Sequence, residues 1–228
     1  MSSNTAILFF SRSARSEAFY KRIDKSISFE KNLKIIQEMK TATMKKIHLS
    51  GLHCIEIDEK LQEGFSFGER LHKALKSCFH AGYENIIIIG NDCPDLQSDD
   101  LVHSTQILQR KDFVLGPDLN KGLYLIGISK NVFKNIDFQK LPWEKKCLAT
   151  FLETILHEND FKGTILDAKS DLNERIQVFQ VKSPSFLAYI SLILSEIYEK
   201  LIIPLLSVKY FKHSHCIAAV ELRGPPRS

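Results

Sequence analysis

The chain has 228 residues, of which 44% are hydrophobic and 25% charged, and its formal net charge is +4. This composition is typical of a soluble globular protein and excludes a disordered or collagen-like chain. The charge is mild and spread along the sequence, so no nucleic-acid partner is expected, although a slightly basic surface suits an anionic substrate such as a nucleotide. The length allows one large α/β domain, or a domain of about 200 residues with an extension.

Two features of the sequence predict a cytoplasmic protein. Its five cysteines are scattered and form no CxxC pair, which indicates reduced thiols rather than a disulfide framework. The first residues carry no basic segment before a short apolar run at 6–10, so no secretory signal is expected.

Apolar strands alternate with amphipathic helices along the first 130 residues. We expect helices at 13–25, 30–46, 67–80 and 98–110, and strands at 6–10, 54–57, 86–90, 113–117 and 123–128. This alternation predicts a single three-layer α/β/α domain with a mostly parallel sheet. The last two strands are joined by a few residues, too short for a parallel crossover, so the sheet should be mixed.

The last third of the chain adds a helix at 147–157, a short strand at 164–167 and a strongly apolar helix at 184–207. The apolar helix approaches the roughly 20 residues that a membrane span needs. Glu196, Glu199, Lys200 and Pro204 interrupt it, and charges near the centre of a span are costly in lipid. We therefore predict a domain at 1–182 and a helical extension at 183–228, which packs on the domain or on a second subunit in a homodimer, with no membrane span.

The turn after the strand at 86–90 is the first candidate site. Four consecutive isoleucines lead into Gly90, and carboxylates follow at Asp92 and Asp95. Open α/β sheets bind ligands at the carboxyl ends of such buried strands, and carboxylate oxygens are the ligands that Mg²⁺ prefers. Alternatively, Asp95 caps the following turn and Asp92 is simply exposed.

Polar residues between the strands at 113–117 and 123–128 form a second candidate. Asn120, Lys121 and Gly122 either make an ordinary turn or lie beside Asp92 at the edge of the sheet.

Basic residues form a third candidate. Arg12 and Lys21 follow the first strand, where phosphates could lie, and Arg70 is in the first turn of a helix, whose N-terminus attracts anions. Solvent-exposed surface is the alternative for all three. The sequence contains no P-loop and no GxGxxG motif.

Five segments in order resemble one known family. They are Phe67-Gly68-Glu69-Arg70-Leu71, Gly90 to Leu96, Leu115 to Gly127, Trp143, and Ile165 to Leu172. Together they resemble the GT-A-type radical-SAM/selenodomain-associated transferases, which are relatives of the nucleotide-diphospho-sugar transferases.

The resemblance implies a nucleotide-sugar pocket at the carboxyl ends of the strands. Asp92 would bind Mg²⁺ or Mn²⁺, which would bridge the diphosphate of the donor and neutralise charge on the leaving nucleotide. The loop after the first strand, with Phe10, Ser11 and Arg12, would receive the base and ribose, and Arg70 would support the site.

Three departures from the family pattern weaken the expectation of catalysis. The family's glycine-containing basic first loop is echoed only by Lys21 and Arg22. The family's Asp-Gly-Gly is Asn120-Lys121-Gly122, and asparagine can coordinate a metal but cannot act as a base. Lys121 could compensate for this second departure as a cationic phosphate ligand. In the third, Ile165 replaces the first aspartate of the last element.

We therefore expect a metal-dependent glycosyltransferase-like protein that uses a nucleotide-diphospho-sugar donor and an acceptor that the sequence does not identify. Asp92 and Asn120 are the predicted catalytic residues, Asp92 and Asp95 the predicted metal ligands, and the predicted donor-binding residues are Phe10, Ser11, Arg12, Lys21, Arg70, Lys121 and Gly122. The alternatives are a degenerate family member that binds a nucleotide or a protein without turnover, and a nucleotidyltransferase.

Overall fold

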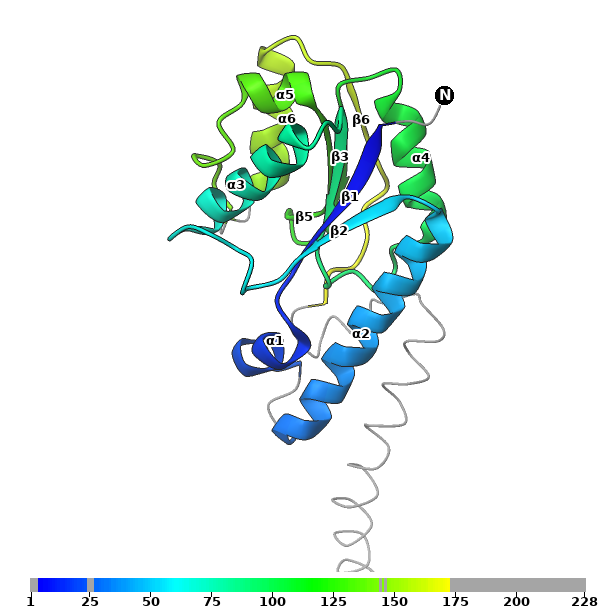
Figure 1. The fold of residues 1–228 in the computed structure, drawn as a ribbon, viewed down its shortest axis with the longest axis vertical. Coiled ribbons are helices and arrows are strands. Elements are labelled where there is room, and N and C mark those ends of the chain that lie inside the picture. Colours follow the sequence, from blue (N-terminus) through cyan, green and yellow to red (C-terminus); the bar gives the residue numbers. More distant parts are fainter. Residues whose placement is uncertain (1–3, 24–26, 144, 146, 173–228) are drawn as a thin grey trace, which may run out of the picture. The chain divides into compact units, whose positions relative to one another are not determined.

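The computed structural model describes residues 4–23, 27–143, 145 and 147–172 (Figure 1). These residues form a six-stranded sheet with helices on both faces, in the strand order β2-β1-β3-β5-β4-β6. The strands are β1 (Thr5–Phe10), β2 (His53–Ile57), β3 (Asn85–Ile89), β4 (Phe113–Pro117), β5 (Leu123–Ser129) and β6 (Gly163–Ile165).

The sheet is mixed and mostly parallel, as predicted. β1 pairs in parallel with β2 and β3, and β4 pairs in parallel with β6. β5 runs antiparallel to both β3 and β4, because only a short turn joins it to β4. The carboxyl ends of the five parallel-running strands consequently lie at one edge of the sheet, where β5 begins.

The helices are divided between the two faces of the sheet, and α1 lies at the carboxyl edge (Figure 1). In chain order they are α1 (Ala14–Tyr20), α2 (Phe29–Ser50), α3 (Phe67–His80), α4 (Ser98–Leu108), α5 (Lys130–Asn135) and α6 (Leu148–Glu158). Helices α3, α5 and α6 contribute to one core cluster, and α2 and α4 contribute to the other. The expected three-layer architecture is therefore confirmed for the described residues.

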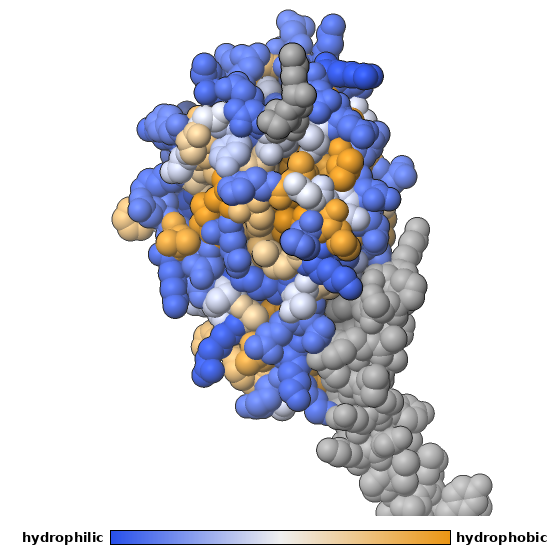
Figure 2. Space-filling model, turned by 45° about the vertical axis from the view of Figure 1, so that its right-hand side comes forward, coloured by the Kyte–Doolittle hydropathy of each residue, from blue (hydrophilic) through white to orange (hydrophobic). Residues whose placement is uncertain are grey.

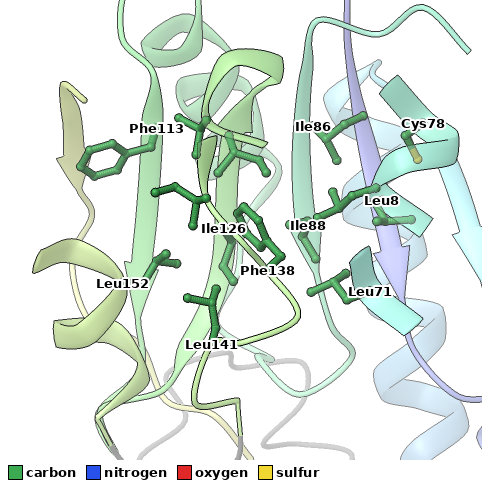
Figure 3. Close-up of a cluster of buried hydrophobic side chains, with 14 of the residues drawn as sticks. Leu8, Leu71, Cys78, Ile86, Ile88, Phe113, Ile126, Phe138, Leu141 and Leu152 are labelled. Carbon is green, nitrogen blue, oxygen red and sulfur yellow. The ribbon is translucent and has the colours of Figure 1, made fainter. Parts of the chain in front are cut away.

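The central strands are buried on both faces because they lie between these two cores. Leu8 and Ile88 point into the cluster with α3 (Figure 3), whereas Ile7 and Ile87 belong to the cluster with α2 and α4. This double burial explains why β3 consists of consecutive isoleucines rather than an alternating pattern.

Helix α1 is shorter than the expected helix at 13–25, and a buried side chain explains where it ends. Asn32 of α2 is fully buried, and its amide nitrogen donates to the carbonyls of Ala18 (3.0 Å) and Lys21 (2.7 Å). Its side-chain oxygen accepts from the N–H of Ile23 (3.1 Å). These bonds satisfy backbone groups that a longer helix would have paired internally.

Helix α5 was not expected, because a helix of six residues is too short to show a reliable periodicity. The apolar helix expected at 184–207, and with it the extension at 183–228, lies outside the described residues. In the part of the chain that the structure describes, no helix is long and apolar enough to cross a membrane.

The face shown in Figure 2 is largely hydrophilic, with apolar side chains gathered near its centre. Large exposed apolar residues among the described part include Leu49, Leu61 and Val102. Exposed apolar residues are common on monomeric proteins, so this feature alone identifies no partner.

Gly68 provides a test of how tightly the start of α3 is packed. A Cβ at this position would lie 2.6 Å from the backbone oxygen of Gln139 and 3.0 Å from Nε1 of Trp143. Because backbone atoms cannot move aside as a flexible side chain can, Gly68→Ala should lower the free energy of unfolding by about 1–3 kcal/mol. Urea denaturation of both proteins measures this, and equal stabilities would contradict the packing.

Candidate functional site

Four loops meet at the carboxyl edge of the sheet. The register of β1 with β3 continues toward the loops at 11–13 and 90–97, since Phe9 pairs with Ile89. The N–H of Leu172 donates to the carbonyl of Asp92 (2.7 Å), which brings the segment after β6 beside the β3 loop. Asp118 and Lys169 form an isolated parallel bridge, so the turn between β4 and β5 also lies along this segment.

Asp92 forms an ion pair with Lys21, which directly follows α1. The Lys21 side chain is only 11% exposed, and that of Asp92 is 35% exposed. Glu17, one turn earlier on α1, places a second carboxylate 4.0 Å from the same ammonium group. The structure thus brings together two residues predicted for the site, Asp92 and Lys21, and adds a third that the sequence did not indicate.

Glu17 is held in an environment that opposes its charge. Burial raises the pKa of its carboxyl group, and the nearby Asp92 carboxylate raises it further, while Lys21 and Arg12 act in the opposite direction. The site therefore contains two carboxylates that share one principal counter-ion.

This environment makes a pH-dependent prediction for Glu17→Gln. A carboxyl group with a raised pKa in the folded protein favours folding below its unfolded pKa, and this contribution is lost as the pH rises through the folded pKa. At pH 7 the ionised Glu17 therefore destabilises the fold, and Glu17→Gln should raise the melting temperature. The difference should shrink as the pH falls from 7 through the raised folded pKa, and it should be nearly absent below the unfolded pKa of about 4.5, which thermal melts from pH 4 to 7 measure. A lower melting temperature for the variant at pH 7 would contradict the burial of this charge.

Three buried polar atoms in the loops that follow β1, β3 and β6 have no hydrogen-bond partner. They are Oγ of Ser11 after β1, Oδ1 of Asn91 after β3, and Oγ of Ser170 after β6. Each of these residues is at least nine-tenths buried. Buried polar atoms are normally satisfied, so an unpaired one calls for an explanation such as a bound water, an ion, a ligand or local strain. Ser11 was among the predicted residues, whereas Asn91 and Ser170 were not.

Asp95 lies in a different environment from Asp92. It is 9% exposed, and its carbonyl accepts from Nζ of Lys169 (3.2 Å), which also pairs with Asp100. Nζ of Lys46 donates to the neighbouring carbonyl of Pro94 (2.6 Å). These two lysines hold the turn from both sides, so Asp95 contributes to the support of the turn, and its role as a metal ligand stays a prediction.

Cys93, between these aspartates, is a buried thiol. Burial raises its pKa to about 12, with the Asp171 carboxylate adding to the shift. The thiolate is therefore suppressed at neutral pH, and Cys93 is unsuited to act as a nucleophile.

The turn between β4 and β5 is organised by Asp118. Its Oδ1 accepts from the N–H groups of Asn120 (2.6 Å) and Gly122 (2.8 Å), in the manner of an Asx turn. Asn120 and Lys121 are exposed, and Lys121 has a φ of 70°, in the left-handed region that favours glycine. Gly122 and Asn120 thus contribute backbone groups to the turn, and no contact joins the Asn120 side chain to Asp92 among the described interactions.

The remaining predicted residues make contacts near the start of α3 and near the end of α1. The guanidinium group of Arg70 donates to the carbonyl of Phe65 (3.2 Å), and Phe10 packs edge-on against Phe67. The Arg12 guanidinium lies over the ring of Tyr20, 4.2 Å from its centroid. These contacts stabilise the loops and do not connect Arg70 to Asp92.

The described residues line a larger and a smaller hollow near this edge. The larger, of about 690 Å³, is lined by residues of α1 and the loop after β2, among them Ser13, Phe19, Tyr20 and Glu59. The smaller, of about 180 Å³, lies between the β4–β5 turn and the start of α6, with Asp118, Lys121 and Glu153 in its wall.

The residues of the site that could bind a divalent cation are the carboxylates of Asp92 and Glu17. Among the described residues, no three His, Cys, Asp or Glu side chains form a ready-made metal centre. Mg²⁺ is commonly held by one or two carboxylates together with substrate phosphates and water, and Asp92 with Glu17 provides two carboxylates on one ammonium group. The donor set therefore fits a cation that binds together with a phosphorylated ligand.

Comparisons with known proteins show which families and solved structures the chain is similar to. A family model described as "Uncharacterized protein conserved in bacteria (DUF2064)" matches residues 36–145. A comparison with curated proteins found no match. Among solved structures, a "putative nucleotide-diphospho-sugar transferase" from Desulfovibrio desulfuricans superposes with a TM-score of 0.68 at 18% identity, covering 85% of this chain and 98% of that protein.

Two further solved structures are more distant. An Rv0371c homolog from a Mycobacterium species has a TM-score of 0.45 and 12% identity, with 84% of this chain and 100% of that one covered. A cytidylyltransferase from Leptospira borgpetersenii has a TM-score of 0.43 and 14% identity, with 85% and 94% covered. Neither likeness is close enough to support an argument about function. Residues 36–145 are thus similar to the DUF2064 family, and the fold of the chain is similar to that of the Desulfovibrio desulfuricans protein.

Proposed function

We propose that this protein is a transferase that binds a nucleotide-diphospho-sugar donor at the carboxyl edge of its sheet, around Asp92. The observation that carries the proposal is the half-buried Asp92–Lys21 pair together with the unpartnered buried oxygens of Ser11, Asn91 and Ser170. A carboxylate, an ammonium group and several free hydrogen-bonding atoms are the groups that a hydrated diphosphate and its sugar require.

Different residues of the chain would bind different parts of the donor. Lys21 supplies the positive charge for the diphosphate, and Ser11 donates its free hydroxyl to a phosphate or ribose oxygen. The rings of Phe19 and Tyr20, exposed beside the larger hollow, offer surfaces on which a nucleobase can stack. Lys121, beside the smaller hollow, can attract an anionic part of the donor or acceptor.

A divalent cation, Mg²⁺ or Mn²⁺, is part of this proposal. Asp92 would hold it, and when bound it would neutralise the charge that develops on the departing nucleotide. Asp92 also orients Lys21, and the lysines at the Pro94 and Asp95 carbonyls keep the Asp92 turn in place.

A ligand screen tests the proposal. The melting temperature of the full chain is measured with UDP-, GDP-, CDP- and TDP-sugars, each with Mn²⁺ and with a chelator. At least one donor should raise the melting temperature through preferential binding to the folded state, with Mn²⁺ increasing the effect. If no nucleotide sugar stabilises the protein under either condition, the proposed donor site is wrong.

A second candidate function is binding without turnover. The Asp-Gly pair of the family that the sequence resembles is Asn120-Lys121 here, and Lys121 lies on an exposed turn with a φ of 70°. Release of nucleoside diphosphate from the donor found in the screen separates the two. Continuous release indicates a transferase, and stabilisation without release indicates a binder. Pyrophosphate release from a nucleoside triphosphate would instead indicate nucleotidyl transfer.

A cytoplasmic location and a homodimer formed through the helix at 184–207 complete the proposal. The four described cysteines are free thiols, as expected for a reducing compartment. Sedimentation of the full chain measures the oligomeric state, and a monomer at all concentrations would remove the dimer.

A further inference from the structure

The positive charge that faces the two carboxylates of the candidate site comes from a residue of the protein, Lys21. The ammonium group of Lys21 lies against Asp92 and 4.0 Å from Glu17, so it occupies the position in which a cation would meet both carboxylates. The side chains of Lys21 and Glu17 are 11% and 18% exposed, which keeps water from competing effectively for these contacts. The Lys21 ammonium group therefore occupies the place that a metal cation would take between the two carboxylates, and it is largely shielded from solvent.

Backbone contacts hold Lys21 at this position. Its N–H donates to the Glu17 carbonyl (2.8 Å), and its own carbonyl accepts from the buried Asn32 (2.7 Å). The backbone is thus anchored while the four-carbon side chain can still swing. A lysine side chain carries a compact charge on a flexible stem, so its head can move to a new anion without a change in the fold.

We propose that Glu17 and Asp92 form a two-carboxylate cation site that the Lys21 ammonium group keeps closed until a diphosphate arrives. This inference rests on the proposed function for the identity of the diphosphate, but its first step concerns the metal alone. A cation that approaches the carboxylates without a diphosphate meets the repulsion of Lys21, whose ammonium group already offsets part of their negative charge. When a diphosphate enters, Lys21 transfers to the phosphate oxygens and leaves Glu17 and Asp92 to the cation.

The unpartnered Asn91 oxygen supports a ligand at this place. Asn91 is 5% exposed, its Oδ1 has no hydrogen-bond partner, and it directly precedes Asp92. A neutral amide oxygen is a suitable ligand for a hard cation, or for a water molecule bound to one. A free amide oxygen thus belongs to the residue that directly precedes Asp92, next to the pair of carboxylates that contact Lys21.

Titration with Mn²⁺ alone, followed by the electron paramagnetic resonance signal of free Mn²⁺, tests this inference on the full chain. Lys21→Met should bind Mn²⁺ roughly tenfold or more tightly than the unmodified protein, because the competing charge is removed. Lys21→Arg keeps the charge and should bind as weakly as the unmodified protein. The double variant Glu17→Gln, Lys21→Met should lose the gain.

The matched control is Lys130→Met. Lys130 also forms an ion pair, with Glu84 at 3.4 Å, but at the opposite edge of the sheet, so its loss should leave Mn²⁺ binding unchanged. Lys21→Gln is a second, polar replacement that must give the same gain, and thermal melts confirm that each variant is folded.

Two outcomes overturn the inference. Either Lys21→Met and Lys21→Gln bind Mn²⁺ no more tightly than the unmodified protein, or the double variant retains the gain, which would remove Glu17 from the site. A failed nucleotide screen with the Mn²⁺ results as expected would instead refute the proposed donor and leave the cation site in place.

Discussion

Replacing Asp92 by alanine is expected to abolish the Mn²⁺-dependent part of the stabilisation by a nucleotide-sugar donor and to lower donor turnover by roughly a hundredfold or more. The substitution removes the carboxylate that would hold the cation and leaves the ammonium group of Lys21 without its close partner. Thermal shift with Mn²⁺ and with a chelator measures the first effect, and release of nucleoside diphosphate measures the second.

Asp99→Asn is the matched control for this experiment. Asp99 is an exposed aspartate in the first turn of α4, close to Asp92 in sequence but outside the candidate site. Its replacement should leave donor stabilisation and turnover unchanged. An Asp92→Ala protein that keeps the full Mn²⁺-dependent shift would show that the cation binds elsewhere.

Replacing Asn32 by leucine should destabilise the fold by about 3–5 kcal/mol, a large effect for one side chain. The change removes three hydrogen bonds and leaves the carbonyls of Ala18 and Lys21 and the N–H of Ile23 without partners in a buried region. Because one of these bonds anchors the backbone of Lys21, donor binding should weaken as well. Urea denaturation gives the free energy of unfolding, and the thermal-shift screen gives the effect on binding.

Thr105→Val is the control for Asn32→Leu, because Thr105 is also buried and polar but its side-chain hydrogen bond can be lost at little cost in stability. Its hydroxyl donates to the Leu101 carbonyl (3.1 Å) in the preceding turn of the same helix, so its loss leaves no buried group unpaired. The cost should be about 1 kcal/mol or less. A similarly small cost for Asn32→Leu would mean that Asn32 does not determine where α1 ends.

Much of the fold could be predicted because its core strands and amphipathic helices carry strong local patterns. The boundaries of α3 agree with the prediction, since Ser66 caps the helix with a reciprocal capping box to Glu69 and its apolar face is regular. The end of α1 could not be predicted in this way. It depends on Asn32, a residue of the next helix, and contacts between elements leave no periodic signal in the sequence.

The candidate site was predicted in part for the same reason. Asp92 follows a strand that is unmistakably buried, and the end of such a strand is a general location for ligand binding. Lys21 was identified as a basic residue that follows the first strand, and the resemblance of the first loop supported it. Glu17, Asn91 and Ser170 were missed, because their importance comes from burial and from missing partners, which only the folded arrangement reveals.

The contacts of Asp95 and Arg70 could not be predicted from their positions in the sequence. Two aspartates three residues apart suggested a shared cation, but the turn places Asp95 in a buried region whose backbone is held by Lys46 and Lys169. Arg70, expected to attract phosphate at a helix N-terminus, donates to a carbonyl of its own loop. The metal-binding and donor-binding roles of these two residues stay predictions.

Anomalous diffraction at the manganese absorption edge, from crystals of the full chain with Mn²⁺ and the nucleoside diphosphate found in the screen, tests the central claim most directly. We predict a manganese peak between Asp92 and the diphosphate, with Nζ of Lys21 moved from Asp92 to a phosphate oxygen. A peak away from Asp92, or a diphosphate bound while Lys21 still pairs with Asp92, would contradict the account.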